Sequence, residues 1–140
     1  MSSRMLIAVS SPWASEKLAA PIEDLARRLQ AEAVVAHVAQ VQGDDEHEQD
    51  ASLRGEQTLK LLTHVLREAG IAAESVMLFS DDVSKAILNT AKARGCNLIV
   101  LGLSAKGRLK RLIAGDVPTN VIRQTEIPVL LYPANWNGEI

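Results

Sequence analysis

Apolar and polar residues fall into two kinds of block along the chain. Short runs that are almost wholly apolar, without alternation, predict strands buried on both faces, as in parallel sheets. Longer blocks with apolar residues at three- and four-residue spacing predict amphipathic helices. The predicted strands are Arg4–Ser10, Ala33–Ala39, Glu74–Phe79, Asn97–Leu101 and Ile127–Tyr132. The predicted helices are Ser15–Gln30, a segment marked by Leu53–Leu66 and ended by Gly70, a segment capped by Ser80–Asp82 that runs through Arg94, and about Val117 to Gln124.

Two features interrupt this pattern, a proline inside a predicted helix and a wholly polar segment. Pro21 lies inside the first predicted helix, and an interior proline removes a backbone hydrogen bond. We therefore expect a kink at Pro21 or a helix that begins near Ala20. Residues 42–50 are wholly polar and carry five carboxylates within seven positions, so about 41–52 is predicted to be a flexible, solvated loop.

Strands that alternate with helices through short turns predict an α/β fold, with a parallel sheet covered by helices on both faces. A chain of 140 residues suits a single domain, 1–140, with a C-terminal tail at 133–140. In open sheets of this class the ligand crevice lies outside the carboxyl ends of the strands, where the strand order reverses. That rule selects the Ser10–Trp13 loop and the Gly102–Gly115 loop.

Composition excludes several classes of function. Fifteen basic and seventeen acidic residues give a net charge of −2, and only four residues are aromatic, which argues against a nucleic-acid partner. The lone Cys96 excludes an internal disulfide and a four-cysteine zinc site, and it fits a reducing, cytoplasmic location. His37, His47 and His64 have no ligand-like spacing, so we predict no metal site. The first apolar run is too short to span a membrane, and we expect no direct membrane insertion.

The loop that begins at Gly102 has the composition of an anion site. Three glycines, four cations and the start of the last predicted helix fall between Gly102 and Asp116. Backbone N–H groups in a glycine-permitted turn and at a helix N-terminus can hold a phosphate. The alternative is a solvated basic loop whose glycines only allow tight turning. The Walker lysine pattern and the dinucleotide fingerprint are both absent.

These residues carry a family resemblance: the whole chain resembles a universal stress protein domain. The match is most specific from Asn97 to Val117, and it continues through Val121–Arg123 and Ile127–Leu131. The resemblance implies a three-layer sandwich with a five-stranded parallel sheet in the order 3-2-1-4-5. It also implies pairing of two copies through the last strand. Such domains fall into ATP-binding and non-binding groups.

The chain departs from the ATP-binding pattern at three positions. That pattern is a glycine, two residues, a glycine, nine residues, then a glycine and a serine or threonine. Gly102 and Gly115 match it, whereas Ala105 replaces the second glycine and Asp116 replaces the hydroxyl residue. ATP-binding members also end the first strand with an aspartate, and here that position is Ser10.

Asp116 is the most consequential of these departures. Ala105 disfavours a positive φ by about 1 kcal/mol, whereas a carboxylate about 4 Å from a phosphate charge costs about 4 kcal/mol at an effective dielectric constant of 20. A bridging Mg²⁺ or Arg108 would offset that repulsion. Asp116 also suits the N-cap of the last predicted helix, a role worth about 1 kcal/mol. We therefore hypothesise that the anion site is partly filled by the chain's own carboxylate.

These observations predict a non-catalytic sensor or adaptor domain with a degenerate nucleotide crevice, weak or no ATP binding, and no resident cofactor. One alternative is a domain that binds ATP or AMP with Mg²⁺ and has slow ATPase activity. The other is a cytoplasmic regulatory module of a membrane transporter that binds a small anion or a cyclic nucleotide. The candidate crevice residues are Ser10, Ser11, Val38, Gly102, Ser104, Ala105, Lys106, Gly107, Arg108, Gly115, Asp116 and Val117.

The last predicted strand presents an apolar edge that needs a cover. We predict a homodimer that pairs through Val129, Leu130, Leu131 and Tyr132. The alternative is that the tail after Pro133, with Trp136, folds back over this edge. Nothing in the sequence identifies a further protein partner.

Overall fold

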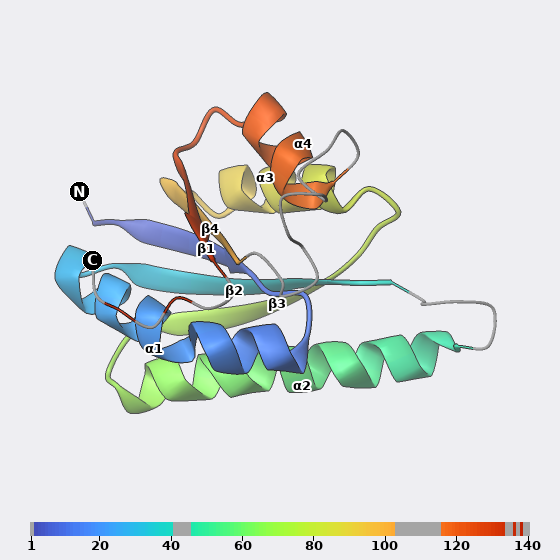
Figure 1. Cartoon of the computed structure of the whole chain (residues 1–140), viewed down its shortest axis with the longest axis horizontal. Coiled ribbons are helices and arrows are strands. Elements are labelled where there is room, and N and C mark those ends of the chain that lie inside the picture. The colour runs from blue at the N-terminus through green and yellow to red at the C-terminus, as the bar shows by residue number, and fades with distance from the viewer. Residues whose placement is uncertain (1, 41–45, 103–115, 134–135, 137, 139–140) are drawn as a thin grey trace.

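The computed structural model describes residues 2–40, 46–102, 116–133, 136 and 138. Its helices and strands are β1 (Arg4–Ala8), α1 (Pro12–Leu29), β2 (Glu32–Ala39), α2 (Glu48–Glu68), β3 (Ala73–Phe79), α3 (Val83–Ala93), β4 (Leu98–Gly102), α4 (Val117–Gln124) and β5 (Val129–Tyr132). The strands form one parallel sheet in the order β3-β2-β1-β4-β5. Helices α1 and α2 cover one face and α3 and α4 the other, which confirms the predicted three-layer α/β fold (Figure 1).

The central strand β1 explains why its sequence shows no alternation. Met5, Leu6 and Ile7 are completely buried. Met5 and Ile7 join the core under α1 and α2, whereas Leu6 joins the core under α3 and α4. Because successive side chains point to opposite faces and both faces are covered, every position of the strand after Arg4 is apolar.

Helix α1 begins earlier than the sequence predicts. It starts at Pro12, and Pro21 lies inside it, so the expected start near Ala20 is wrong. The Ser11 side chain caps the helix by accepting a hydrogen bond from the Ala14 N–H at 3.1 Å, and Pro12 stands at the first helical position, where it is well tolerated. Core packing of the helix, with Ile22 completely buried next to Pro21, outweighs the cost of the interior proline.

Helix α2 also begins earlier than predicted, inside the acidic segment. Its first residue is Glu48, so the predicted loop of about 41–52 is wrong for 48–52, and its residues 41–45 lie outside the described chain. The Asp50 carboxylate accepts a hydrogen bond from the His47 backbone N–H at 3.3 Å. Acidic residues in a first helical turn are stabilised by the helix dipole, which explains why a run of carboxylates is helical here.

The remaining boundaries are close to the predictions. Strand β1 ends at Ala8 rather than Ser10, and β5 starts at Val129 rather than Ile127. Helix α3 starts after the predicted cap Asp82, whose side chain accepts from the Lys85 N–H at 3.1 Å. Gly70 and Gly95 follow α2 and α3 with φ values of 80° and 68°, the left-handed conformation that glycine adopts at low cost. Among the described residues, no helix combines the length and the hydropathy needed to cross a bilayer.

Candidate functional site

The carboxyl ends of β2, β1 and β4 lie next to one another in the sheet, and they form the candidate crevice. The sheet order reverses at β1, because the chain continues from β1 to β2 on one side and reaches β4 and β5 on the other. This is the position at which open α/β sheets hold ligands. The structure brings together there the predicted residues Ser10, Val38 and Gly102, which lie at or near the ends of β1, β2 and β4.

The segment after β1 is held firmly although it lies outside the strand. The Val9 N–H donates to the carbonyl of Ala36 at 2.9 Å, and Val9 is buried. Ser10 is exposed, and Ser11 is half-buried with its side chain engaged in capping α1. Of this pair, Ser11 is engaged by the helix, whereas the exposed Ser10 stands at the position where the resemblance expects an aspartate.

Gly102 ends β4 in close contact with α1. A Cβ added at this position would lie 3.0 Å from Cδ1 of Leu18, which is tighter than ordinary van der Waals contact. Val38 is half-buried and packs against the core under α3 and α4, and Val117 packs against the same core. The crevice residues Val38 and Val117 thus belong to the α3–α4 face of the sheet.

Asp116 caps α4 as the sequence predicts. Its carboxylate oxygen Oδ1 accepts a hydrogen bond from the Val117 N–H at 3.1 Å. One of the N–H groups at this helix end is therefore already bonded to an anionic side chain of the chain itself. The other predicted crevice residues, Ser104, Ala105, Lys106, Gly107, Arg108 and Gly115, lie outside the described residues.

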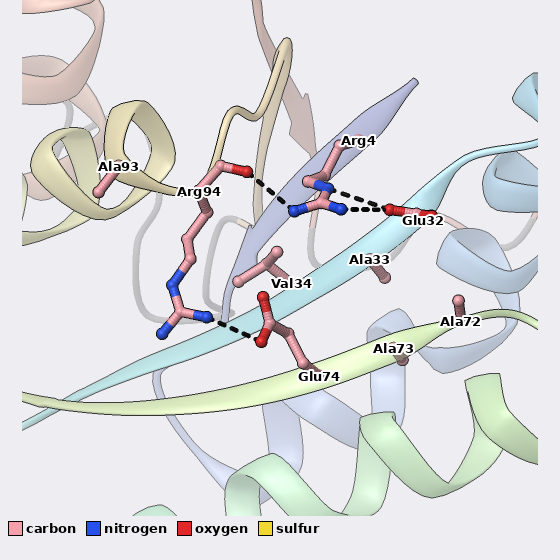
Figure 2. Close-up of a pocket in the computed structure, with 9 residues that line it drawn as sticks. All are labelled: Arg4, Glu32, Ala33, Val34, Ala72, Ala73, Glu74, Ala93 and Arg94. Atoms are coloured by element: carbon pink, nitrogen blue, oxygen red, sulfur yellow. Dashed lines mark hydrogen bonds and ion pairs between the residues drawn. The ribbon is translucent and has the colours of Figure 1, made fainter. Parts of the chain in front are cut away.

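A concavity of about 540 Å³ lies at the amino-terminal edge of the sheet, opposite the candidate crevice (Figure 2). Arg4 donates to Glu32 Oε2 through Nε at 3.1 Å and Nη2 at 2.6 Å, and its Nη1 donates to the Arg94 carbonyl at 3.0 Å. Arg94 Nη1 donates to Glu74 Oε2 at 2.8 Å. The hydrogen bonds that Arg4 donates to the Glu32 carboxylate raise the pKa of Arg4. These residues connect β1, β2 and β3 to the end of α3. Each cation already has a carboxylate partner, so they offer no uncompensated charge to a ligand.

Two other groups bear on the chemistry of the chain. Burial raises the pKa of the Cys96 thiol, which makes it a poor nucleophile. In the part of the chain that the structure describes, no three His, Cys, Asp or Glu residues are grouped to hold a metal ion.

His37 is the residue near the crevice that the sequence does not single out. It lies on β2 with a side chain that is only 4% exposed, and its Nδ1 lies 2.8 Å from the carbonyl oxygen of Val9. Burial lowers its pKa, so the neutral ring is favoured. A polar side chain near the end of an otherwise apolar strand is the signal in the sequence that could have drawn attention to it.

Comparison with known proteins agrees with the α/β fold. The model of the universal stress protein family matches residues 1–133. No curated protein sequence matches the chain. The solved structures with a similar fold include a universal stress protein family member from Burkholderia pseudomallei, with a TM-score of 0.72 and 22% identity over 94% of this chain and 96% of that one.

Two further similar structures hold nucleotides. The universal stress protein from Archaeoglobus fulgidus in complex with dAMP has a TM-score of 0.67 and 19% identity over 92% of this chain and 96% of that one. An Arabidopsis thaliana family member with AMP bound has a TM-score of 0.69 and 16% identity over 95% of this chain and 92% of that one. At these identities the likeness shows a shared fold, whereas the family model covers nearly the whole chain. The chain belongs to the universal stress protein family.

Proposed function

We propose that this protein is a non-catalytic, cytoplasmic sensor or adaptor whose nucleotide crevice binds ATP weakly or not at all. The observation that carries the proposal is the hydrogen bond from the Val117 N–H to the Asp116 carboxylate at the start of α4. The N-terminus of a helix carries a partial positive charge that stabilises a nearby anion. At α4 the Asp116 carboxylate already occupies that position. A phosphate that approached the same helix end would meet that carboxylate.

The repulsion between the Asp116 carboxylate and a phosphate of ATP decides whether the crevice binds ATP. A phosphate charge about 4 Å from the Asp116 carboxylate would be opposed by about 4 kcal/mol at an effective dielectric constant of 20. Since 1.36 kcal/mol is a factor of ten, this repulsion corresponds to about a thousandfold in affinity. Ser10 is exposed and stands where the resemblance expects an aspartate, so the contact implied for that aspartate is lost as well.

Calorimetry with ATP tests the proposal directly. We compare the natural chain with Asp116→Ser, which restores the hydroxyl of the family pattern, and with Asp116→Asn, which keeps a capping oxygen but removes the charge. The proposal predicts little or no ATP binding by the natural chain and at least tenfold tighter binding by both variants. Micromolar ATP binding by the natural chain that neither substitution changes would refute it.

A nucleoside monophosphate is the second candidate ligand, because two of the similar structures hold AMP or dAMP. AMP carries less charge than ATP, so its binding is less opposed by Asp116. A thermal-shift comparison of AMP and ATP, each with and without Mg²⁺, distinguishes the two ligands. A ligand present at one hundred times its dissociation constant adds about 2.7 kcal/mol to the free energy of unfolding, which is easily measured.

We also propose that two copies pair through β5, which stands at one edge of the sheet. Val129, Leu130 and Leu131 are half-buried, whereas the Tyr132 side chain is only 4% exposed and belongs to the chain's own core. Tyr132 would therefore contribute through its backbone rather than its side chain.

Light scattering on the full chain and on a variant without residues 133–140 tests this pairing. A dimer in both samples supports pairing through β5. A monomeric full chain that dimerises only when the tail is removed would show instead that the tail covers this edge.

A further inference from the structure

The connection between β1 and α1 is held by two hydrogen bonds, one to the backbone N–H of Val9 and one to its backbone carbonyl. The Val9 N–H donates to the Ala36 carbonyl at 2.9 Å, and the Val9 carbonyl oxygen lies 2.8 Å from Nδ1 of His37. Both partners belong to β2. Because Val9 lies just beyond the last residue of β1, these two bonds extend the contact between β1 and β2 to the place where the chain leaves the sheet.

The direction of the second bond is settled by chemistry. A carbonyl oxygen can only accept, so the proton of this bond is carried by Nδ1 of His37. Burial lowers the pKa of His37, which favours the neutral ring over the imidazolium. The neutral ring that fits the contact is therefore the Nδ1–H tautomer.

The ring is also confined from the side of α2. A Cβ added at Gly55 would lie 2.8 Å from Cδ2 of His37 and 2.7 Å from Sδ of Met77. The absence of a side chain at Gly55 lets α2 approach the ring this closely. His37 therefore has little room to rotate away from the Val9 carbonyl.

What the bond holds in place is the predicted crevice segment. Val9 is followed by Ser10, which is exposed at the carboxyl edge of the sheet, and by Ser11, which caps α1. The carbonyl of Ser11 also accepts from the Ser15 N–H at 3.0 Å, so the position of Val9 is coupled to the start of α1. A shift of the Val9 carbonyl would change both the place of Ser10 and the first turn of the helix.

We propose that His37 is the positioning residue of the crevice: its Nδ1–H holds the Val9 carbonyl and thereby sets the place of Ser10 and Ser11. The importance of this role for ligand binding rests on the proposed function. The role itself is a property of the free protein and is tested without a ligand.

The first measurement is the tautomer of His37 in the natural chain, read from the ¹⁵N chemical shifts of its ring nitrogens at neutral pH. The proposal predicts a protonated Nδ1 and an unprotonated Nε2. An unprotonated Nδ1 would overturn it, because that nitrogen would have no proton to donate. This result does not depend on any variant being folded.

The second measurement is amide hydrogen exchange of Val9, Ala14 and Ser15, whose N–H groups are all bonded at this connection. His37→Leu puts an apolar side chain in this place and removes the donor, whereas His37→Asn supplies an amide N–H donor at a similar position. Val35→Ala, on the same face of β2 and completely buried, is the matched control for a general loss of stability.

We expect His37→Leu to raise the exchange rates of these three amides at least tenfold relative to Ile99 in β4. His37→Asn should restore them to within about threefold, and Val35→Ala should leave the ratio unchanged. Equal ratios in His37→Leu and Val35→Ala would overturn the proposal.

AMP titration then separates the two proposals. Loss of AMP affinity in His37→Leu, with recovery in His37→Asn, supports the role of His37 in the crevice. If the natural chain does not bind AMP, the proposal of AMP as the ligand fails, whereas the tautomer and exchange results still decide whether His37 holds the Val9 carbonyl.

Discussion

Replacing Gly55 by alanine should destabilise the protein, although the same replacement stabilises most helices. Gly55 lies within α2. A methyl group there would lie 2.7 Å from both Sδ and Cε of Met77 and 2.8 Å from Cδ2 of His37. The end of the Met77 side chain can move aside, but the His37 ring is held by its bond to Val9.

The magnitude follows from two opposing terms. Alanine in place of glycine stabilises a helix interior by about 1 kcal/mol. Crowding in a packed core costs about 1–3 kcal/mol. Because the rigid ring of His37 must shift by roughly half an ångström to restore normal contact, we expect crowding to dominate, with a net loss of about 1 kcal/mol in the free energy of unfolding.

Urea unfolding of the natural chain, Gly55→Ala and Gly70→Ala measures this effect. Gly70 has a φ of 80°, and no heavy atom of the described residues lies within 4 Å of an added Cβ, so its replacement tests backbone strain without crowding. Gly55→Ala should also speed the hydrogen exchange of Val9, whereas Gly70→Ala should not. An increase of about 1 kcal/mol in the stability of Gly55→Ala, as for an uncrowded helix, would refute the close contact between α2 and His37.

Three further predictions concern buried polar groups. Burial and Arg54 lower the pKa of His37 in the folded protein, so the unfolded chain binds a proton at this ring more readily. The free energy of unfolding should therefore fall as the pH drops below about 6.5. In a pH series of thermal melts, His37→Asn should weaken this pH dependence. The buried hydroxyl of Thr63 has no hydrogen-bond partner among the described residues, so Thr63→Val should raise the free energy of unfolding by up to about 1 kcal/mol in urea titrations. The Ser15 hydroxyl donates to the Thr58 carbonyl at 2.7 Å, and Ser15→Ala should cost about 1–2 kcal/mol in the same assay, whereas no loss would show that this bond is unimportant.

Much of the fold could be predicted because its signals are local. Mostly apolar runs mark the strands, and Asp82 and Asp116 mark the starts of α3 and α4, where their side chains accept backbone hydrogen bonds. The early start of α1 was missed because Pro21 suggested a break, whereas the cap at Ser11 and the burial of Ile22 hold the helix together. The early start of α2 was missed because its first turn is acidic, as loops often are.

The candidate site was only partly predictable for a different reason. The strand order placed Ser10, Val38 and Gly102 together, since the ends of neighbouring parallel strands meet at one edge. The role of His37 could not be predicted, because its partner is a backbone carbonyl 28 positions away in the chain. Which backbone group a side chain meets depends on the register of the strands, and the residue type alone does not predict that register.

A crystal structure of the natural chain, purified and crystallised without added nucleotide, tests the central claim most directly. The account predicts that the Asp116 carboxylate is bonded to the Val117 N–H and that no triphosphate lies at the start of α4. Co-purified ATP with its phosphates seated against residues 105–116 would contradict the account and identify the protein as an ATP binder.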